Sequence, residues 1–240
     1  MDMKDSRAFW SRKRTRGQSI VEFALMAPIL LIILSGLFEF GFLFTYYLSV
    51  LDAGRNAARF SSDSLYDVTD NNTDCGSTKD FYRQTACMAV SELANEQPTI
   101  QLCLWDSPAT HSCSPHTWSG NDDVIVSVFS VLREGGTTVI RFPNDGSGEN
   151  GWSYDADVRF GPGNQTSGRT GMHISSFTTG KILSLLESGT PNTGYVLVEI
   201  NYNYHQILGM PWFTQFVADP VPFHIYALWP CVSAEPTSTI

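Results

Sequence analysis

The run from Phe23 to Leu51 contains a single charged side chain, Glu39, and this apolar stretch limits the folds available to the chain. Between Phe23 and Leu48 it holds 15 leucine, isoleucine and phenylalanine residues. Each contributes about −0.3 to −0.6 kcal/mol to membrane insertion, and together they outweigh the roughly +2.5 to +3.5 kcal/mol cost of one carboxylate. Because about 20 helical residues cross a hydrocarbon core, we expect a transmembrane helix over residues 18–51 that continues to about residue 62.

A secretory signal peptide is the competing interpretation of this run. Its apolar region is about 7–15 residues long and ends at a cleavage site flanked by small residues. The run in this chain is considerably longer, and it ends in Phe44-Thr45-Tyr46-Tyr47, where the tyrosines suit a membrane interface. We therefore expect an anchor that is retained.

Charge is distributed unevenly on the two sides of the apolar run. Residues 1–17 carry six basic and two acidic side chains, whereas residues 52–240 carry 9 basic and 20 acidic ones. Basic residues favour the cytoplasmic side of a membrane, so we expect a basic cytoplasmic leader over 1–17. An extracytoplasmic head over 63–235, in the periplasm or outside the cell, and a frayed tail over 236–240 would follow. The acidic head repels phosphate, which argues against nucleic acid as a partner.

All five cysteines lie beyond the expected anchor, which is typical of an oxidising compartment. Cys75 and Cys87 are one candidate disulfide pair, and Cys103 and Cys113 are another. The sequence alone leaves several pairings open. Cys231 is either unpaired or available for a link between molecules.

The head has the pattern of an α+β domain with an antiparallel sheet and two short helices. Apolar spacing predicts helices over Lys79–Glu96 and Ser175–Glu187. Residues 143–171 are rich in Gly, Asn and Asp and predict a long exposed insertion. Strands are predicted by alternation or apolar runs at Thr99–Trp105, Asp123–Leu132, Thr137–Phe142, Tyr195–Leu208 and Val221–Trp229.

The junction between the basic leader and the apolar run has a distinctive pattern. It reads Arg16-Gly17-Gln18-Ser19-Ile20-Val21-Glu22-Phe23-Ala24-Leu25, followed by Pro28, Gly36-Leu37-Phe38-Glu39-Phe40-Gly41, Ala53 and Arg55 to Arg59. Over residues 16–60 this resembles the TadE-like family, minor pilin-like subunits of the tight-adherence (Flp/Tad) pilus machinery. The resemblance implies cleavage between Gly17 and Gln18 by a prepilin peptidase. It also implies partners among other pilin-like subunits and pilus assembly proteins.

Glu22 would be the fifth residue after that cleavage. A lone carboxylate at a membrane boundary is costly, whereas a carboxylate paired with the new amine of Gln18 on a neighbouring subunit is not. Glu39 is predicted to make an assembly contact with another helix, and the alternative is a simple position at the far membrane interface, about 20 residues from Ile20. Gly36 lies one turn before Glu39 on the same helix face and would let a partner helix approach closely. Phe23 departs from the tyrosine typical of major Flp pilins, which favours a minor, initiating or tip subunit.

Other chemistry has weaker support in the sequence. Cys103, His111, Cys113 and His116 match no zinc-ligand spacing, and the acidic stretch 67–74 lacks the order of an EF-hand. The motifs of common hydrolases, phosphate loops and dinucleotide sites do not occur. We therefore expect no catalytic residue, metal or cofactor. The alternative function is a single-pass, membrane-anchored binding module with a disulfide-stapled head and no pilus role.

Overall fold

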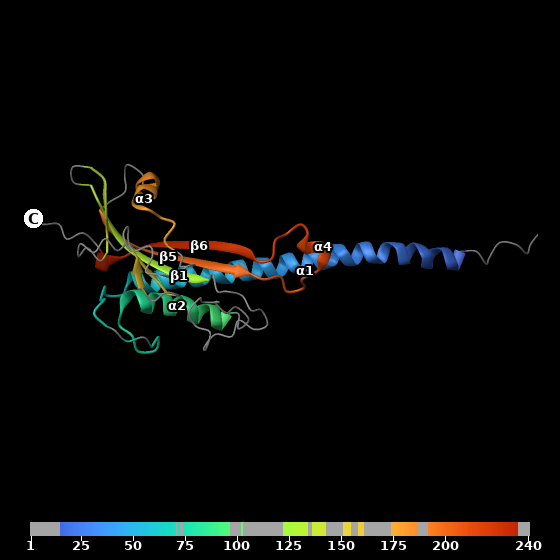
Figure 1. Cartoon of the computed structure of the whole chain (residues 1–240), viewed down its shortest axis with the longest axis horizontal. Helices are drawn as coiled ribbons and strands as arrows, with labels where there is room; N and C mark the ends of the chain where they lie inside the picture. Colours follow the sequence, from blue (N-terminus) through green and yellow to red (C-terminus); the bar gives the residue numbers. More distant parts are fainter. Residues whose placement is uncertain are drawn as a thin grey trace, which may run out of the picture. The chain divides into compact units, whose positions relative to one another are not determined.

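A computed structural model of the chain describes residues 15–70, 72, 74–96, 102, 122–133, 136–142, 151–154, 158–160, 174–186 and 192–234. The chain divides into two compact units. The first unit comprises Met1–Leu43 and Gln206–Asp219, and the second comprises Phe44–His205 and Pro220–Ile240. Both are drawn in Figure 1 with the labels used below.

Helix α1 (Thr15–Ser62) is continuous and contributes to both units. Its stretch Ser19–Ser62 has a mean hydropathy of 2.4 in the most apolar 18-residue window. Among the described residues it is the one helix long and apolar enough to cross a membrane, judged by length and composition. The expected long apolar helix that ends near residue 62 is therefore confirmed.

The second unit contains a six-stranded sheet in which every strand pair is antiparallel. The strand order is β4-β3-β1-β5-β6, and β2 pairs with β1 beside β3. The strands are β1 (Asp123–Leu132), β2 (Thr138–Arg141), β3 (Gly151–Ser153), β4 (Val158–Phe160), β5 (Thr193–Tyr204) and β6 (Val221–Pro230). An α+β fold with an antiparallel sheet was expected, and it is confirmed.

One face of the sheet packs against the C-terminal half of α1. Ile200 of β5 lies against Gly54 of α1, so Val198, two residues earlier on β5, points to the same face. Val126 of β1 lies directly opposite Val198 and shares this face. Small buried residues of α1 let the helix approach the sheet, and a Cβ added to Gly54 would lie 3.5 Å from Ile200. The other buried α1 positions in this stretch are Ser49, Val50, Ala53, Ala57, Ala58, Ser61 and Ser62.

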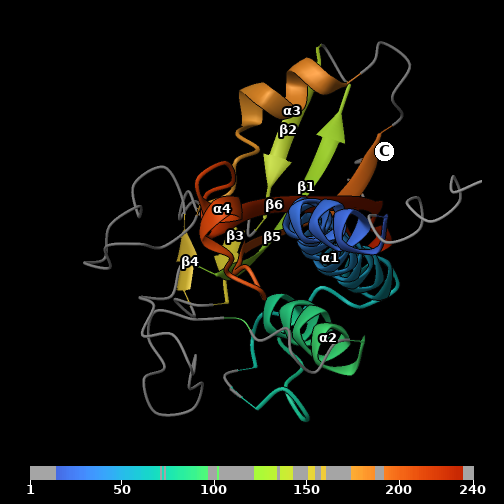
Figure 2. The same ribbon diagram turned by 90° about the vertical axis from the view of Figure 1, so that its right-hand side faces the viewer.

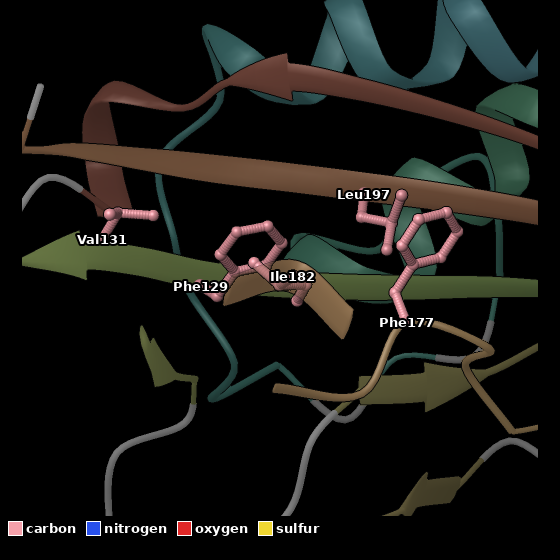
Figure 3. Close-up of a cluster of buried hydrophobic side chains, with 5 residues drawn as sticks. All are labelled: Phe129, Val131, Phe177, Ile182 and Leu197. Carbon is pink, nitrogen blue, oxygen red and sulfur yellow. The ribbon is translucent and has the colours of Figure 1, made fainter. Parts of the chain in front are cut away.

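The opposite face of the sheet carries a separate apolar cluster, shown in Figure 3. Phe129, Val131 and Leu197 rise from β1 and β5 and meet two residues from the segment that contains α3 (Thr179–Leu185). These two are Phe177 and Ile182. Figures 1 and 2 show α2 (Phe81–Glu96) and α3 on opposite sides of the sheet.

The C-terminal turn η1 (Val232–Ala234) closes over the sheet. Ser130 Oγ donates to the Ala234 carbonyl at 2.5 Å, and the Cys231 amide donates to the Gly194 carbonyl at 2.8 Å. A Cβ on Gly194 would lie 2.3 Å from the Ala234 carbonyl carbon. Only glycine therefore permits this approach of two backbones.

The predicted exposed insertion at 143–171 is wrong for Gly151–Ser153, which forms β3, is buried and pairs with β1. Within the same insertion, Val158–Phe160 forms β4. Trp152 supplies the apolar burial that the surrounding Gly, Asn and Asp residues obscure in the sequence. The remainder of the insertion, apart from Tyr154, lies outside the described residues.

One predicted helix differs in extent from the observed one, and one predicted strand cannot be compared with the structure. The second predicted helix is shorter than Ser175–Glu187, because Thr178 caps it by accepting from the Lys181 amide. The predicted strand at Thr99–Trp105 lies outside the described residues except for Leu102.

The structure tests the predictions for three of the five cysteines. Cys75 and Cys87 form the expected disulfide, which ties the loop before α2 to that helix. Cys231 is free and buried. The proposed partners Cys103 and Cys113 lie outside the described residues.

Candidate assembly and membrane site on α1

The N-terminal part of α1 presents an almost continuous apolar surface. From Ile20 to Leu34 its large side chains are exposed in the structure, which contains this chain alone. They include Ile20, Val21, Phe23, Leu25, Met26, Ile29, Leu30, Leu31, Ile32, Ile33 and Leu34. A soluble protein rarely exposes an apolar patch of this extent, so the surface is suited to lipid or to other apolar helices.

The predicted processing junction lies at the start of this helix. Gly17 and Gln18 fall in the first turn of α1, which begins at Thr15, and Glu22 is exposed one turn later. Amide groups in the first turn of a helix lack intrahelical acceptors. The predicted cleavage site therefore lies at the end of the helix, where fewer backbone hydrogen bonds hold the chain than in the helix interior.

Glu39 has a different environment from Glu22. It is only 2% exposed, and its carboxylate accepts from the backbone amides of Ile207 at 2.8 Å and Leu208 at 2.9 Å. Hydrogen bonds to a charged acceptor are stronger than neutral ones. The carboxylate inside the apolar run is thus held by a segment 168 positions further along the chain.

The partner segment, residues 206–219, is called the apolar loop below. It joins β5 to β6 and contains the short helix α4 (Pro211–Thr214). Trp212 Nε1 donates to Ser35 Oγ at 3.2 Å, and the Phe213 ring meets Phe40 edge-on at 5.4 Å. The loop therefore packs against the α1 turns on either side of Glu39.

The base of the apolar loop is closed by its own polar groups. The Gln206 amide donates to Asp219 Oδ1 at 3.3 Å, and its side chain donates to the Val217 carbonyl at 3.0 Å. Gly209 has φ +52°, a left-handed conformation that favours glycine and turns the chain toward α4. Proline at the first position of α4 fits the helix start, where no amide partner is needed.

Gly36 is not used for packing within the described part of the chain. A Cβ built on it meets no atom within 4 Å. Its predicted role in close approach of another helix stays a prediction, as does the assembly role of Glu22 and Glu39. The structure does add an intrachain role for Glu39.

A second buried carboxylate lies in the second unit. Glu199 has no exposed surface and accepts from the Ser176 amide at 3.0 Å, from Ser175 Oγ, and from Ser176 Oγ at 2.9 Å. His224 Nε2 lies 3.0 Å from the same carboxylate. The alternation of β5 predicts that Glu199 faces solvent, but this face is covered by residues 175–177, which the carboxylate holds in place.

The acidic stretch 67–74 is organised by its own backbone. Asp67 accepts from the Thr69 amide, and Asp70 accepts from the amides of Asn72 and Lys79. A side-chain hydrogen bond from Thr69 lowers the pKa of Asp67, and the Lys79 backbone hydrogen bond lowers the pKa of Asp70. These carboxylates stabilise a loop, and no group of three or more potential metal ligands occurs in the described residues.

Comparison with protein families gives one match, at the N-terminus. Residues 17–59 match the family model described as TadE-like protein. This segment is similar to TadE-like proteins. No curated protein and no solved structure gives a significant match. The TadE-like segment starts at Gly17 and covers the exposed apolar surface of α1, Gly36 and Glu39.

The apolar loop is the part of this site that the sequence did not reveal to us. A usable signal was present, because no charged residue occurs from Gln206 to Ala218 and the stretch holds Trp212 and two phenylalanines. That composition is unusual for a connection between two strands, since such connections are generally polar. A search for uncharged loops in the head would have found it.

Proposed function

We propose that the chain is a minor pilin-like structural subunit of a Tad/Flp pilus. Its helix α1 crosses the cytoplasmic membrane with the N-terminus in the cytoplasm, and the head lies in the periplasm or outside the cell. A prepilin peptidase cuts between Gly17 and Gln18, and the mature subunit assembles through α1. The proposal assigns no catalytic residue or cofactor to the chain.

The observation that carries this proposal is the extent of the family match. The TadE-like segment begins at Gly17, the residue before the proposed cut, and ends within the small-residue stretch of α1 that packs on the sheet. It therefore includes the exposed apolar surface as well as the junction. The charge difference between the leader and the head supports the orientation.

Assembly would use the charges that processing creates. After cleavage, the amine of Gln18 on one subunit and the carboxylate of Glu22 on its neighbour form a pair at the membrane boundary. Each group alone is penalised in a poorly hydrated setting, whereas the pair is stabilised. The exposed position of Glu22 leaves it accessible to a neighbouring subunit.

Mass spectrometry of the membrane-extracted protein tests the processing step. We expect a chain that starts at Gln18 in cells with the peptidase, and a full-length chain in cells without it. Gly17→Leu places a bulky residue at the bond and should block cleavage, whereas Ser11→Ala in the leader should not. A wild-type chain that retains residues 1–17 in the presence of the peptidase contradicts the proposal.

Glu22→Ala tests the assembly step separately. The variant should insert into the membrane normally and should reduce incorporation into pili, as measured by immunoblotting of sheared pilus fractions. The outcome also separates the pilus role from that of an anchored binding module. Unchanged incorporation of Glu22→Ala would contradict the assembly role of Glu22, whereas absence of the wild-type chain from the sheared pilus fractions would favour the binding module.

A further inference from the structure

The apolar loop exposes large apolar side chains although it belongs to the head by sequence. Ile207, Leu208, Trp212 and Phe216 are exposed, and Phe216 is 86% exposed. The loop lies in the first unit together with the apolar half of α1. Its exposed surface is therefore an extension of the surface that α1 would present to lipid.

Several backbone groups of the loop already have partners within the protein, which favours entry into a lipid interface. Non-helical backbone is tolerated at membrane depth where it is buried in protein or lines a water-filled cavity. The amides of Ile207 and Leu208 donate to Glu39, and those of Phe213 and Thr214 donate to the Met210 carbonyl. The partners of these amides are all supplied within the first unit.

The position of the contact on α1 sets the depth of the loop. If the hydrocarbon begins at Ile20, about 20 helical residues reach its far boundary at Glu39. The loop contacts α1 at Ser35, Glu39 and Phe40. This places the loop at the outer interface, the depth at which tryptophan is enriched in membrane proteins.

We propose that the apolar loop is a second membrane-embedded element, which inserts Leu208, Trp212 and Phe216 into the lipid interface beside α1. Glu39 is the positioning residue that supplies acceptors for its backbone. The lack of charge from Gln206 to Ala218 favours lipid as the occupant of this surface. The inference rests on the membrane insertion of α1 proposed above.

Fluorescence quenching of a single NBD probe tests the proposal in the full-length chain. The chain is reconstituted into phosphatidylcholine vesicles with or without brominated acyl chains and labelled at Phe216→Cys. Leu31→Cys on α1 serves as the lipid-exposed control, and Leu65→Cys in the second unit serves as the water-exposed control. Labelling of the native cysteines is measured in the unsubstituted chain and subtracted. Phe216 and Leu65 are exposed to a similar degree, 86% and 85%, so neither replacement removes internal packing.

We expect brominated lipid to quench the probe at position 216 several-fold more than the probe at 65, and we expect iodide to show the reverse order. Iodide quenching at 216 equal to that at 65 overturns the proposal. Protection at 216 from both quenchers also overturns it, because another protein surface would then cover the loop. A probe at 31 that brominated lipid does not quench refutes the insertion of α1 itself, which distinguishes that failure from failure of the loop proposal alone.

Discussion

Replacement of Glu39 by alanine should release the apolar loop. The carboxylate accepts two backbone hydrogen bonds, from Ile207 at 2.8 Å and from Leu208 at 2.9 Å. A hydrogen bond to a charged group contributes about 1.5–3 kcal/mol, so the pair stabilises the closed loop by about 3–6 kcal/mol. Because about 1.4 kcal/mol corresponds to a tenfold change in an equilibrium constant, opening should become about 10²- to 10⁴-fold more frequent.

Hydrogen exchange of the Ile207 and Leu208 amides measures this opening directly. The experiment is NMR-detected exchange on the full chain in detergent micelles. Glu39→Gln keeps one acceptor oxygen but loses the charge, so its protection should fall between those of the wild type and Glu39→Ala. A graded series is expected because a neutral hydrogen bond contributes only about 1 kcal/mol.

Glu22→Ala is the matched control, since it removes the same side chain from the same helix. The structure places Glu22 on an exposed part of α1 well before the turns that contact the loop. Its amide protection at Ile207 and Leu208 should equal that of the wild type. Wild-type protection in Glu39→Ala, or an equal loss in both alanine variants, would refute the assigned role of Glu39.

Three further predictions concern other parts of the chain. Gly36→Ala should leave thermal stability unchanged, because the added Cβ meets no atom within 4 Å. If α1 packs against other pilin helices at this position, incorporation of the variant into pili should fall. Unchanged incorporation contradicts that packing. Gly194→Ala should destabilise the head by about 1–3 kcal/mol in denaturant titrations, as expected for overpacking, because its Cβ would lie 2.3 Å from the Ala234 backbone. Gly54→Ala is the control and should not destabilise the head, because its Cβ would lie 3.5 Å from Ile200. Equal losses of stability in the two variants would refute the argument. The folded-state pKa of Asp70 lies below its ordinary value of 3.8, so its contribution to loop stability is present above pH 3.8 and is lost as the pH falls through the folded-state pKa. The Lys79 amide chemical shift should report this change below pH 3.8 and not in Asp70→Asn, and a midpoint above 3.8 contradicts the assignment.

Several elements were predictable because their signals are local. The apolar run predicts α1, and its end near Ser62 follows from the polar residues beyond it. The apolar and alternating runs predict strands at Asp123–Leu132 and Thr137–Phe142, and the observed β1 and β2 match them closely. The alternation after Tyr195 predicts β5, although it does not reveal that Glu199 is buried by residues 175–177.

β3 was not predicted, because its conformation also depends on residues that are distant in the sequence. It is three residues long and lies in a segment rich in residues typical of turns. Its strand conformation depends on pairing with Ile125 and Val126 of β1, which lie more than 25 positions earlier in the chain. A segment this short has no detectable periodicity of its own.

The sequence by itself determined that this chain has a long apolar N-terminal helix, a junction similar to TadE-like proteins and an antiparallel sheet. These properties depend on composition, charge and spacing within short windows. Tertiary structure alone decided the partner of Glu39. The carboxylate interrupts the apolar run for no local reason, and its hydrogen bonds go to amides 168 and 169 positions away. Backbone amides are the same in every residue except proline, so no sequence pattern marks which of them a distant carboxylate will bind.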